Sequence, residues 1–479
     1  MKNTISLAPN SATSEQIRQM FALQQAGTQK VSARTVIERK ARIRAILDFV
    51  LDHQDEIKQA LFRDFQKTES EVIISEIAPL KVEAKFVLKN LKKWLRPEKV
   101  PTPWELLGSS SSIHRIPKGN VLIIGPFNYP WFLTIKPIIW AVAAGNTVMV
   151  KPSELIPHTS SMIRKMVEHI FPPEEVVVVE GNPEVSIELL KLPFNHIYFT
   201  GSPQVGKIVM EAASRHLASV TLELGGKSPV IIDESAKIRD AAYRIAWGKT
   251  LNNGQTCISP DYILVHESVK SAFVEAYKSS IAKMFNAEGK GISQSPSYCR
   301  IVNARHFERI AHLLEDAVEK GAKIETGGET DSAQNFISPT LLSDVTEEME
   351  VMHEEIFGPL LSLVTFRNIE DIPAIVQRRS HPLVLYIFSH NQRNIDYLMQ
   401  NIPSGDAVIN DVIIHFGNKY LPVGGIGNSG IGKSGGYAGF REFTHERSVV
   451  RQVFGSFKPV FPPYEGRAGK LLKLFLRVV

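Results

Sequence analysis

Cys257 is the residue whose surroundings most clearly predict chemistry. It ends the stretch Asn252 to Cys257 (NNGQTC), and Glu223 lies 34 residues upstream in the stretch Leu222 to Lys227 (LELGGK). A thiol attacks carbonyl carbons readily once a neighbouring group removes its proton. The pair therefore favours covalent carbonyl chemistry, although a free cysteine on its own is more often a small, buried apolar side chain.

Four further short stretches follow one order along the chain with these two. They are PFNYP at 126–130, FTGS at 199–202, EEIFGP at 354–359 and LPVGG at 421–425. Six such segments in one order seldom arise by chance, and they resemble the signature segments of the aldehyde dehydrogenase superfamily. Cys257 followed by Pro260-Asp261-Tyr262, and the tyrosine after Asn128, most resemble its class 3 and fatty-aldehyde branch.

The resemblance implies a role for three residues. Cys257 would attack an aldehyde carbon to give a thiohemiacetal, and loss of hydride would leave a thioester that water hydrolyses to the acid. Asn128 matches the family asparagine whose amide, with the backbone N–H of Cys257, stabilises the oxyanion. Glu223 matches the general base, and its position between two leucines predicts burial and a raised pKa.

The resemblance also implies NAD as cofactor, with NADP as a second one. Gly201, Ser202 and Gly206 follow a strand-like run and open a helix, where backbone N–H groups could meet a pyrophosphate. Alone, this loop would be an ordinary turn. The remaining expected contacts are Lys151, Ser153 and Glu154 at the adenosine ribose, Glu355 at the nicotinamide ribose and Phe357 beside the nicotinamide ring.

Composition limits the other possibilities. The 479 residues carry a net charge of +5 from 55 basic and 50 acidic side chains that are interspersed, which argues against nucleic-acid binding. Two cysteines, Cys257 and Cys299, are consistent with a reducing compartment, and the start of the chain lacks an apolar leader. We therefore expect a cytoplasmic protein. The 14 scattered histidines predict no metal site.

Apolar runs recur at regular intervals in the first half of the chain, separated by segments long enough for crossover helices. This rhythm predicts an α/β fold with a parallel, doubly wound, Rossmann-like cofactor domain beside an α/β catalytic domain. A small bridging element would support a homodimer. The expected strand-like runs lie at 121–124, 147–150, 176–179, 197–200, 220–222, 230–232, 262–265, 361–366, 384–388 and 448–454.

The expected domains follow these runs. Residues 1–100 and 118–224 would form the NAD(P)-binding domain, and residues 225–423 the catalytic domain. Residues 101–117 and 445–456 would form the bridging and oligomerisation element, with residues 457–479 as a C-terminal tail. The glycines from Gly424 to Gly432 predict an ordered loop near the domain interface rather than a phosphate loop.

Two alternative functions remain open at this level. A CoA-acylating aldehyde dehydrogenase is the first, although the base at Glu223 favours hydrolysis. A non-catalytic binding or structural protein on the same scaffold is the second, although Cys257, Glu223 and Asn128 are all present. The tail, with apolar residues and the basic residues Lys470, Lys473 and Arg477, could contact a membrane, close the substrate tunnel or only pack on its own subunit.

Overall fold

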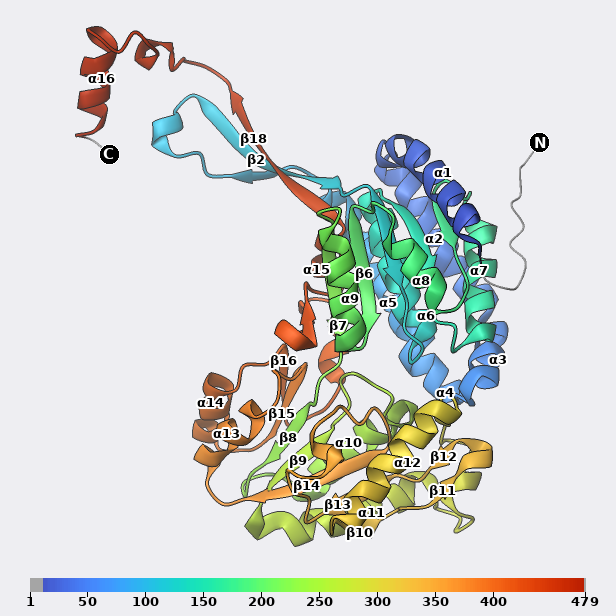
Figure 1. The fold of residues 1–479 in the computed structure, drawn as a ribbon. Coiled ribbons are helices and arrows are strands. Elements are labelled where there is room, and N and C mark those ends of the chain that lie inside the picture. Colours follow the sequence, from blue (N-terminus) through green and yellow to red (C-terminus); the bar gives the residue numbers. More distant parts are fainter. Residues whose placement is uncertain (1–11, 478–479) are drawn as a thin grey trace.

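The computed structural model describes residues 12–477, and a six-stranded sheet forms the centre of its upper body in Figure 1. The strand order is β17-β7-β6-β3-β4-β5, and all neighbours are parallel except β17, which is antiparallel to β7. This confirms the α/β fold. The strands are β3 (Asn120–Ile124), β4 (Thr147–Lys151), β5 (Val176–Val178), β6 (His196–Gly201), β7 (Ser219–Leu224) and β17 (Gly430–Ile431).

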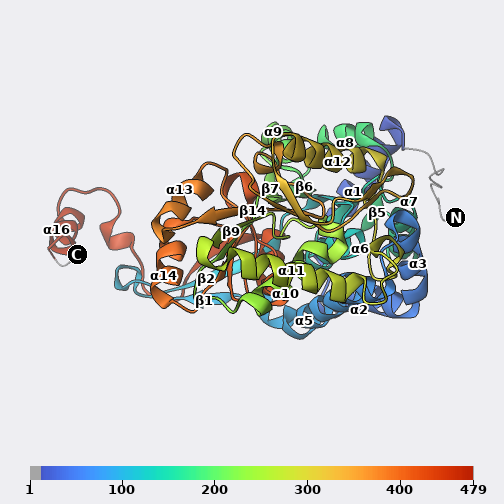
Figure 2. The same ribbon diagram turned by 90° about the horizontal axis from the view of Figure 1, so that it is seen from below.

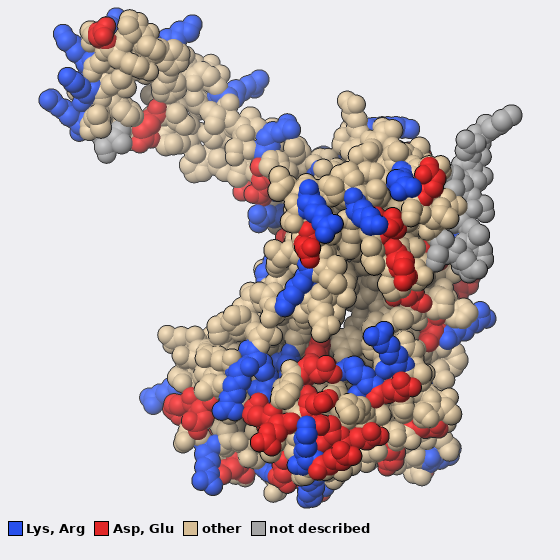
Figure 3. Space-filling model, viewed as in Figure 1, with Lys and Arg blue, Asp and Glu red and all other residues tan. Residues whose placement is uncertain are grey.

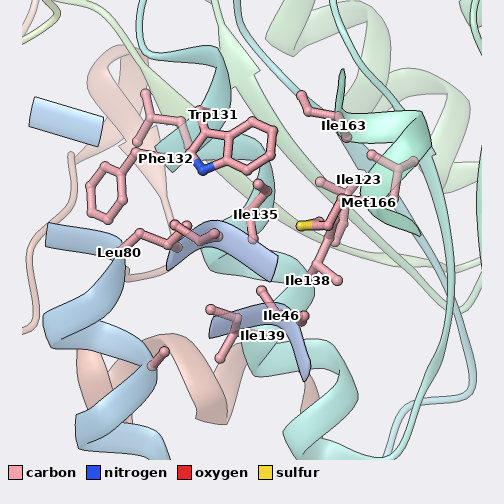
Figure 4. Packing of buried hydrophobic residues seen from close by; sticks show 14 of the residues in the cluster. Ile46, Leu80, Ile123, Trp131, Phe132, Ile135, Ile138, Ile139, Ile163 and Met166 are labelled. Carbon is pink, nitrogen blue, oxygen red and sulfur yellow. The ribbon is translucent and has the colours of Figure 1, made fainter. Parts of the chain in front are cut away.

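Helices connect these strands and cover both faces of the sheet (Figure 1). Every residue of α6 is buried, because this apolar helix lies between the sheet and the N-terminal helices. Figure 4 shows Trp131, Ile135, Ile138 and Ile139 of this helix packed against Ile46 and Leu80. The crossover helices are α6 (Pro130–Ala144), α7 (Pro157–Ile170), α8 (Pro183–Leu190) and α9 (Pro203–Ser214).

The chain up to residue 94 is helical where the structure describes it, as the period of its apolar residues indicates. Thr13 and Thr35 cap the first two helices, and each capping box also uses the third helical residue, Gln16 or Glu38. The helices are α1 (Ser14–Ser32), α2 (Val36–Asp52), α3 (Gln54–Phe65), α4 (Glu69–Val72), a π-helical turn η1 (Ile73–Ile77) and α5 (Ala78–Trp94).

A seven-stranded sheet forms the lower body, in the order β10-β13-β14-β9-β8-β15-β16. All neighbours are parallel except β10. Its strands are β8 (Pro229–Ile232), β9 (Tyr262–His266), β10 (Lys323–Thr326), β13 (Thr340–Ser343), β14 (Leu360–Phe366), β15 (Val384–Phe388) and β16 (Asp406–Ile409). Its helices are α10 (Ile238–Thr250), α11 (Lys270–Phe285), α12 (Ala304–Glu319), α13 (Ile372–Gln377) and α14 (Gln392–Asn401), and β11 (Thr330–Asp331) pairs with β12 (Phe336–Ile337) at its edge.

A third sheet forms an arm that projects from the upper body in both ribbon views (Figures 1 and 2). It contains β1 (Glu98–Val100), β2 (Ser109–Pro117) and β18 (Thr444–Gln452), with β2 at the centre. The pairing of an early hairpin with a late strand was expected, but β18 begins four residues before the expected run and ends two residues before its end. Beyond the arm, the tail carries a short turn η11 (Lys458–Val460) and helix α16 (Arg467–Phe475).

The arm and the tail expose large apolar side chains of the kind that are usually buried in a folded protein. Phe454 is 65% exposed and Leu476 is 78% exposed. Among residues 12–477 no helix is long and apolar enough to cross a membrane. The expectations that concern residues 1–11, including the missing leader, and the last two tail residues lie outside the part of the chain that the structure describes.

Candidate active site

Cys257 lies on a tightly wound loop that follows α10. Asn252 and Asn253 both have left-handed backbones, with φ of 53° and 55°, and Gly254 follows with φ of 71°. Asparagine and glycine adopt this conformation most readily. A Cβ on Gly254 would also collide with the backbone of Gly358, so the sequence NNG fits both the turn and the close approach of the two segments.

Side-chain amides hold this loop in place. Gln255 donates from Nε2 to the carbonyl oxygens of Asn252 and Arg300, 3.1 Å each. Asn253 Nδ2 donates to the Cys299 carbonyl at 2.8 Å. Sequence reasoning gave these amide side chains no role. Three of them within the five residues before the candidate nucleophile were the signal that could have indicated one.

Asn128 is brought to this loop from the other body. It lies just before α6, is 3% exposed, and donates from Nδ2 to the Gln255 carbonyl at 3.0 Å. The next residue ties the same segments together, because Tyr129 Oη lies 2.6 Å from Thr256 Oγ1. An amide nitrogen has two N–H donors, so the bond to Gln255 fixes the Asn128 side chain and uses one of them.

Glu223 lies near the end of β7, where its Oε1 is buried without a hydrogen-bond partner among the described residues. Burial raises the pKa of Glu223 to about 8; the Lys136 ammonium opposes this shift, and the Asp406 carboxylate adds to it. The raised pKa that was expected for this carboxyl is therefore present, although the residue as a whole is only half-buried. A carboxyl with such a pKa is largely protonated at neutral pH and becomes able to accept a proton as the pH approaches 8.

The glycine-rich segment after residue 423 packs directly on this strand. Gly430 of β17 pairs with Glu223, and a Cβ on Gly430 would lie 2.7 Å from the Leu222 carbonyl oxygen. The expected ordered loop is thus an edge strand of the first sheet. It supports the backbone that carries the candidate base.

Glu355 is also beside the thiol. A Cβ on Gly225 would collide with the Glu355 carboxylate, so this glycine leaves the space that the carboxylate fills. Burial raises the pKa of Glu355 to about 8, and the nearby Asp261 carboxylate adds to the shift. Burial likewise raises the pKa of the Cys257 thiol to about 12, and Glu355 contributes more to that shift than Glu223 does. The thiol is therefore neutral in this arrangement.

Two buried charges fix the loop that carries Glu355. Lys227 forms an ion pair with Asp261 and donates to the carbonyl oxygens of Val351 and Glu354. Asp261 Oδ2 in turn accepts from the Ile356 N–H at 2.9 Å. Both residues occur in the motifs recognised in the sequence, but sequence reasoning assigned neither of them a role.

Phe357 follows on the same loop with a left-handed backbone, φ 48°. Its ring meets Phe127 edge to face, with the ring centroids 5.7 Å apart. Phe127 directly precedes the oxyanion candidate Asn128. The two aromatic rings therefore lie between the segments that carry Glu355 and Asn128.

Most of the expected cofactor residues follow β6 and β4, two parallel strands on either side of β3 in the first sheet. Gly201 ends β6, and Ser202 caps α9 by accepting from the Val205 N–H at 3.4 Å. Gly206 lies in the first turn of this helix, where a Cβ would approach Leu224 Cδ2 to 2.7 Å. Close helix-to-strand packing at a strand end is the geometry that receives a dinucleotide pyrophosphate.

Lys151 ends β4, is 2% exposed, and its Nζ lies 2.5 Å from Glu154 Oε2. Ser153 Oγ accepts from the Leu155 N–H at 3.2 Å. Only β3 lies between β4 and the strand that leads to the Gly201 loop. An ammonium and a carboxylate at this place are suited to ribose hydroxyls. These residues fit an adenine dinucleotide, and the described part of the chain contains no cluster of metal-binding side chains.

Known proteins resemble this chain over most of its length. Residues 2–449 match the aldehyde dehydrogenase family. The 4,4'-diaponeurosporen-aldehyde dehydrogenase of Staphylococcus aureus (strain NCTC 8325 / PS 47) is 41% identical over 440 residues, 92% of this chain and 94% of the relative. Aldehyde dehydrogenase family 3 member A2 of Pongo abelii is 41% identical over 428 residues, 89% of this chain and 87% of the relative.

A solved structure agrees with these relatives. The substrate-bound state of Staphylococcus aureus AldH superimposes with a TM-score of 0.92 at 39% identity, covering 96% of this chain and 99% of that one. The relatives confirm the resemblance to the class 3 branch. The chain therefore belongs to the aldehyde dehydrogenase family and is an NAD(P)-dependent aldehyde dehydrogenase.

Proposed function

We propose that Cys257 is the nucleophile, Asn128 the oxyanion donor and Glu223 the base for hydrolysis. The observation that carries this proposal is the hydrogen bond from Asn128 Nδ2 to the Gln255 carbonyl, which places the amide two residues before Cys257. The backbone N–H of Cys257 is the second oxyanion donor. A carboxylate must take the thiol proton, because burial keeps the pKa of Cys257 at about 12.

Each of these three residues then acts in its own step of the reaction. The Cys257 sulfur adds to the aldehyde carbon, and Asn128 donates to the oxygen of the resulting thiohemiacetal. Bound NAD(P)+ supplies the acceptor for the hydride that this intermediate releases. Glu223 removes a proton from water, which hydrolyses the Cys257 thioester and frees the carboxylic acid and the thiol.

A trapping experiment tests these roles. In Glu223→Gln we expect hydride formation in the first turnover, followed by steady-state turnover slowed about 100- to 10,000-fold, the usual loss for a general base. Mass spectrometry of the quenched variant should find an acyl group on Cys257. Cys257→Ser should form no adduct while binding NAD as the wild type does.

Two results would contradict the assignment. Near-wild-type turnover of Glu223→Gln would require another base, with Glu355 the first candidate. Acceleration of wild-type turnover by CoA, with acyl-CoA as product, would favour the CoA-acylating alternative.

The cofactor residues proposed are Lys151, Ser153 and Glu154 at the adenosine ribose, the loop from Gly201 to Gly206 at the pyrophosphate, and Glu355 and Phe357 at the nicotinamide riboside. Glu154 would oppose a 2′-phosphate and Lys151 would favour it, but their ion pair already neutralises the ammonium. We therefore expect both cofactors to be used, with NAD preferred. Values of kcat/KM that favour NADP would refute the preference.

The proposed domains are those expected from the sequence, with the first sheet binding NAD(P) and the second belonging to the catalytic domain. The arm is proposed to form a homodimer. The exposed side chains of Val450, Val453 and Phe454 on and beside β18 support this, because apolar side chains on a projecting strand are normally covered by a partner. Light scattering should give a dimer for the wild type and a monomer for Val450→Asp/Phe454→Asp.

The proposed substrate is an apolar aldehyde. Cys257 is partly buried and packs against an apolar core cluster of the lower body, as do Trp247, Ile413 and Phe416. The Staphylococcus aureus relative is named for 4,4'-diaponeurosporen-aldehyde. We further propose a cytoplasmic enzyme, consistent with the two free cysteines. The exposed basic side chains on the tail (Figure 3) support contact with an anionic membrane surface.

A further inference from the structure

The backbone carbonyl of Asn128 receives two side-chain donors from separate segments. Asn252 Nδ2, on the cysteine loop, donates at 2.9 Å. Lys67 Nζ, from the connection between α3 and α4, donates at 3.3 Å. A carbonyl has two lone pairs, so the oxygen of this residue has a partner for each of them.

Lys67 is fully buried and is held from three sides. Its Nζ forms an ion pair with Glu76 Oε1 at 2.7 Å and lies 4.0 Å from the centroid of the Tyr129 ring. Neither the Lys67 side chain nor the Glu76 side chain has any exposed surface. A desolvated ammonium with these partners has a fixed position, because each competing rotamer would leave the charge without a partner.

Glu76 extends this contact to the first turn of α6. Its Oε2 accepts from the Phe132 N–H at 2.8 Å, while Oε1 accepts from Lys67. The carboxylate lies in η1, a π-helical turn, and such turns often occur near functional sites. The ion pair therefore binds the backbone on both sides of Tyr129. Lys67 donates to the Asn128 carbonyl, and Glu76 accepts from the Phe132 N–H.

Asn252 closes a ring on the other side. Its Nδ2 also donates to the Gln255 carbonyl at 3.1 Å, and that same oxygen accepts from Asn128 Nδ2. The Asn128 carbonyl, the Asn252 amide, the Gln255 carbonyl and the Asn128 amide thus form one hydrogen-bonded circuit. Rotation of the peptide after Asn128 would break this circuit and turn the oxyanion donor away.

We propose that Lys67, held by Glu76, is a positioning residue for the oxyanion donor Asn128. Lys67 does not touch the substrate; it fixes the peptide that sets the direction of the free Asn128 N–H. This inference rests on the proposed role of Asn128. Both the addition of the thiol and the hydrolysis of the thioester form an oxyanion, so a misplaced donor slows both steps.

A double-mutant cycle separates positioning from general support of the fold. We expect Lys67→Met to lower both the first-turnover hydride rate and kcat by about 10- to 100-fold, the range for losing a hydrogen bond from a charged donor. The Kd for NAD should stay at the wild-type value. In an Asn128→Ala background, the same substitution should change kcat by less than about twofold, because the donor that it positions is already gone.

Two further variants keep this test interpretable. Lys67→Met/Glu76→Gln removes both charges together and restores the fold should the unpaired Glu76 carboxylate unfold the single variant. Lys58→Met is the matched control, because Lys58 also joins the α3 region to α4, through Glu69 at 2.5 Å, but does not contact Asn128. It should retain wild-type kcat.

The outcomes are distinct. Equal losses from Lys67→Met, or from the double variant, in the wild-type and Asn128→Ala backgrounds would overturn the positioning role and leave the role of Asn128 intact. Wild-type kcat in Asn128→Ala itself would overturn both proposals. Loss confined to KM, with kcat and the first-turnover rate unchanged, would also overturn the positioning role.

Discussion

Two carboxyl groups, those of Glu223 and Glu355, lie close enough to the Cys257 thiol to shift its pKa. Burial raises the pKa of both Glu223 and Glu355 to about 8. A carboxyl that stays protonated up to this pH cannot act as a base until the pH approaches 8. We therefore expect deacylation in the wild type to become faster as the pH rises from 6 to 9.

The same shifts predict a pH dependence of stability. The reference pKa of these carboxyls is 4.5, so between pH 4.5 and about 8 the folded protein holds protons that the unfolded chain has released. The free energy of unfolding must fall as pH rises through that interval. We expect the gain in Tm of Glu223→Gln/Glu355→Gln over wild type to be larger at pH 9 than at pH 6.

Calorimetry at the two pH values measures this difference. Glu348→Gln is the control, because Glu348 is exposed and its replacement should give the same small change at both. A gain that is equal at pH 6 and pH 9 would show that the two buried carboxyls do not titrate as their surroundings require.

The residues that sequence reasoning found and missed differ in a physical way. Cys257, Glu223 and Asn128 stand in short local motifs, so their types and neighbours were sufficient to select them. Glu355 was also selected by its motif, but it lies 98 residues after Cys257, and only the folded chain shows that the two are neighbours. Lys67 has no motif, because its role depends on contacts with Glu76 and Asn128 that local sequence does not encode.

At the scale of elements, α9 approaches β7 closely at Gly206, where an added Cβ would lie 2.7 Å from Leu224 Cδ2. Gly206→Ala should push the helix from Leu224, at a cost of about 1–3 kcal/mol for overpacking. Because Ser202, at the start of α9, is proposed to meet the pyrophosphate, the Kd for NAD should rise and Tm should fall. Gly417→Ala is the matched control, since nothing lies within 4 Å of the added Cβ. If Gly206→Ala bound NAD with unchanged affinity, the proposed contact between α9 and the cofactor would be wrong.

Elements with a strong pattern were predictable and short ones were not. The buried strands β3 and β4 are dominated by apolar residues, and each contains its expected range and is one residue longer. β17 has two residues in a glycine-rich segment, where neither period nor propensity indicates a strand. β10 and β16 are short and partly exposed, and they pair at the two edges of their sheet. Their identity is set by the neighbouring strand rather than by their own residues.

At the scale of the whole molecule, the tail lies far from the bodies at the end of the arm (Figures 1 and 2). Within one subunit Phe475 contacts Trp104, with ring centroids 5.8 Å apart, but Leu474 and Leu476 remain exposed. Truncation after Tyr464 should raise KM for long-chain aldehydes more than for short ones, if α16 covers a substrate entrance. Steady-state kinetics over a series of chain lengths measures this.

A separate assay distinguishes the other roles of the tail. Lys470→Glu/Lys473→Glu should abolish sedimentation with anionic vesicles and leave KM unchanged, if membrane contact uses the basic side chains. An equal rise in KM for short and long aldehydes on truncation would leave α16 with a structural role alone.

The pairing of β17 with β7 affects how the chain folds while it is being synthesised. Residue 430 lies more than 200 positions after Glu223, and β18 meets β2 across an even longer interval. Contacts of such sequence separation form late. During synthesis the entire seven-stranded sheet emerges while the strand of Glu223 still has an uncovered edge. Uncovered edges recruit other chains, so ribosomal products that stop before residue 430 should be the aggregation-prone ones.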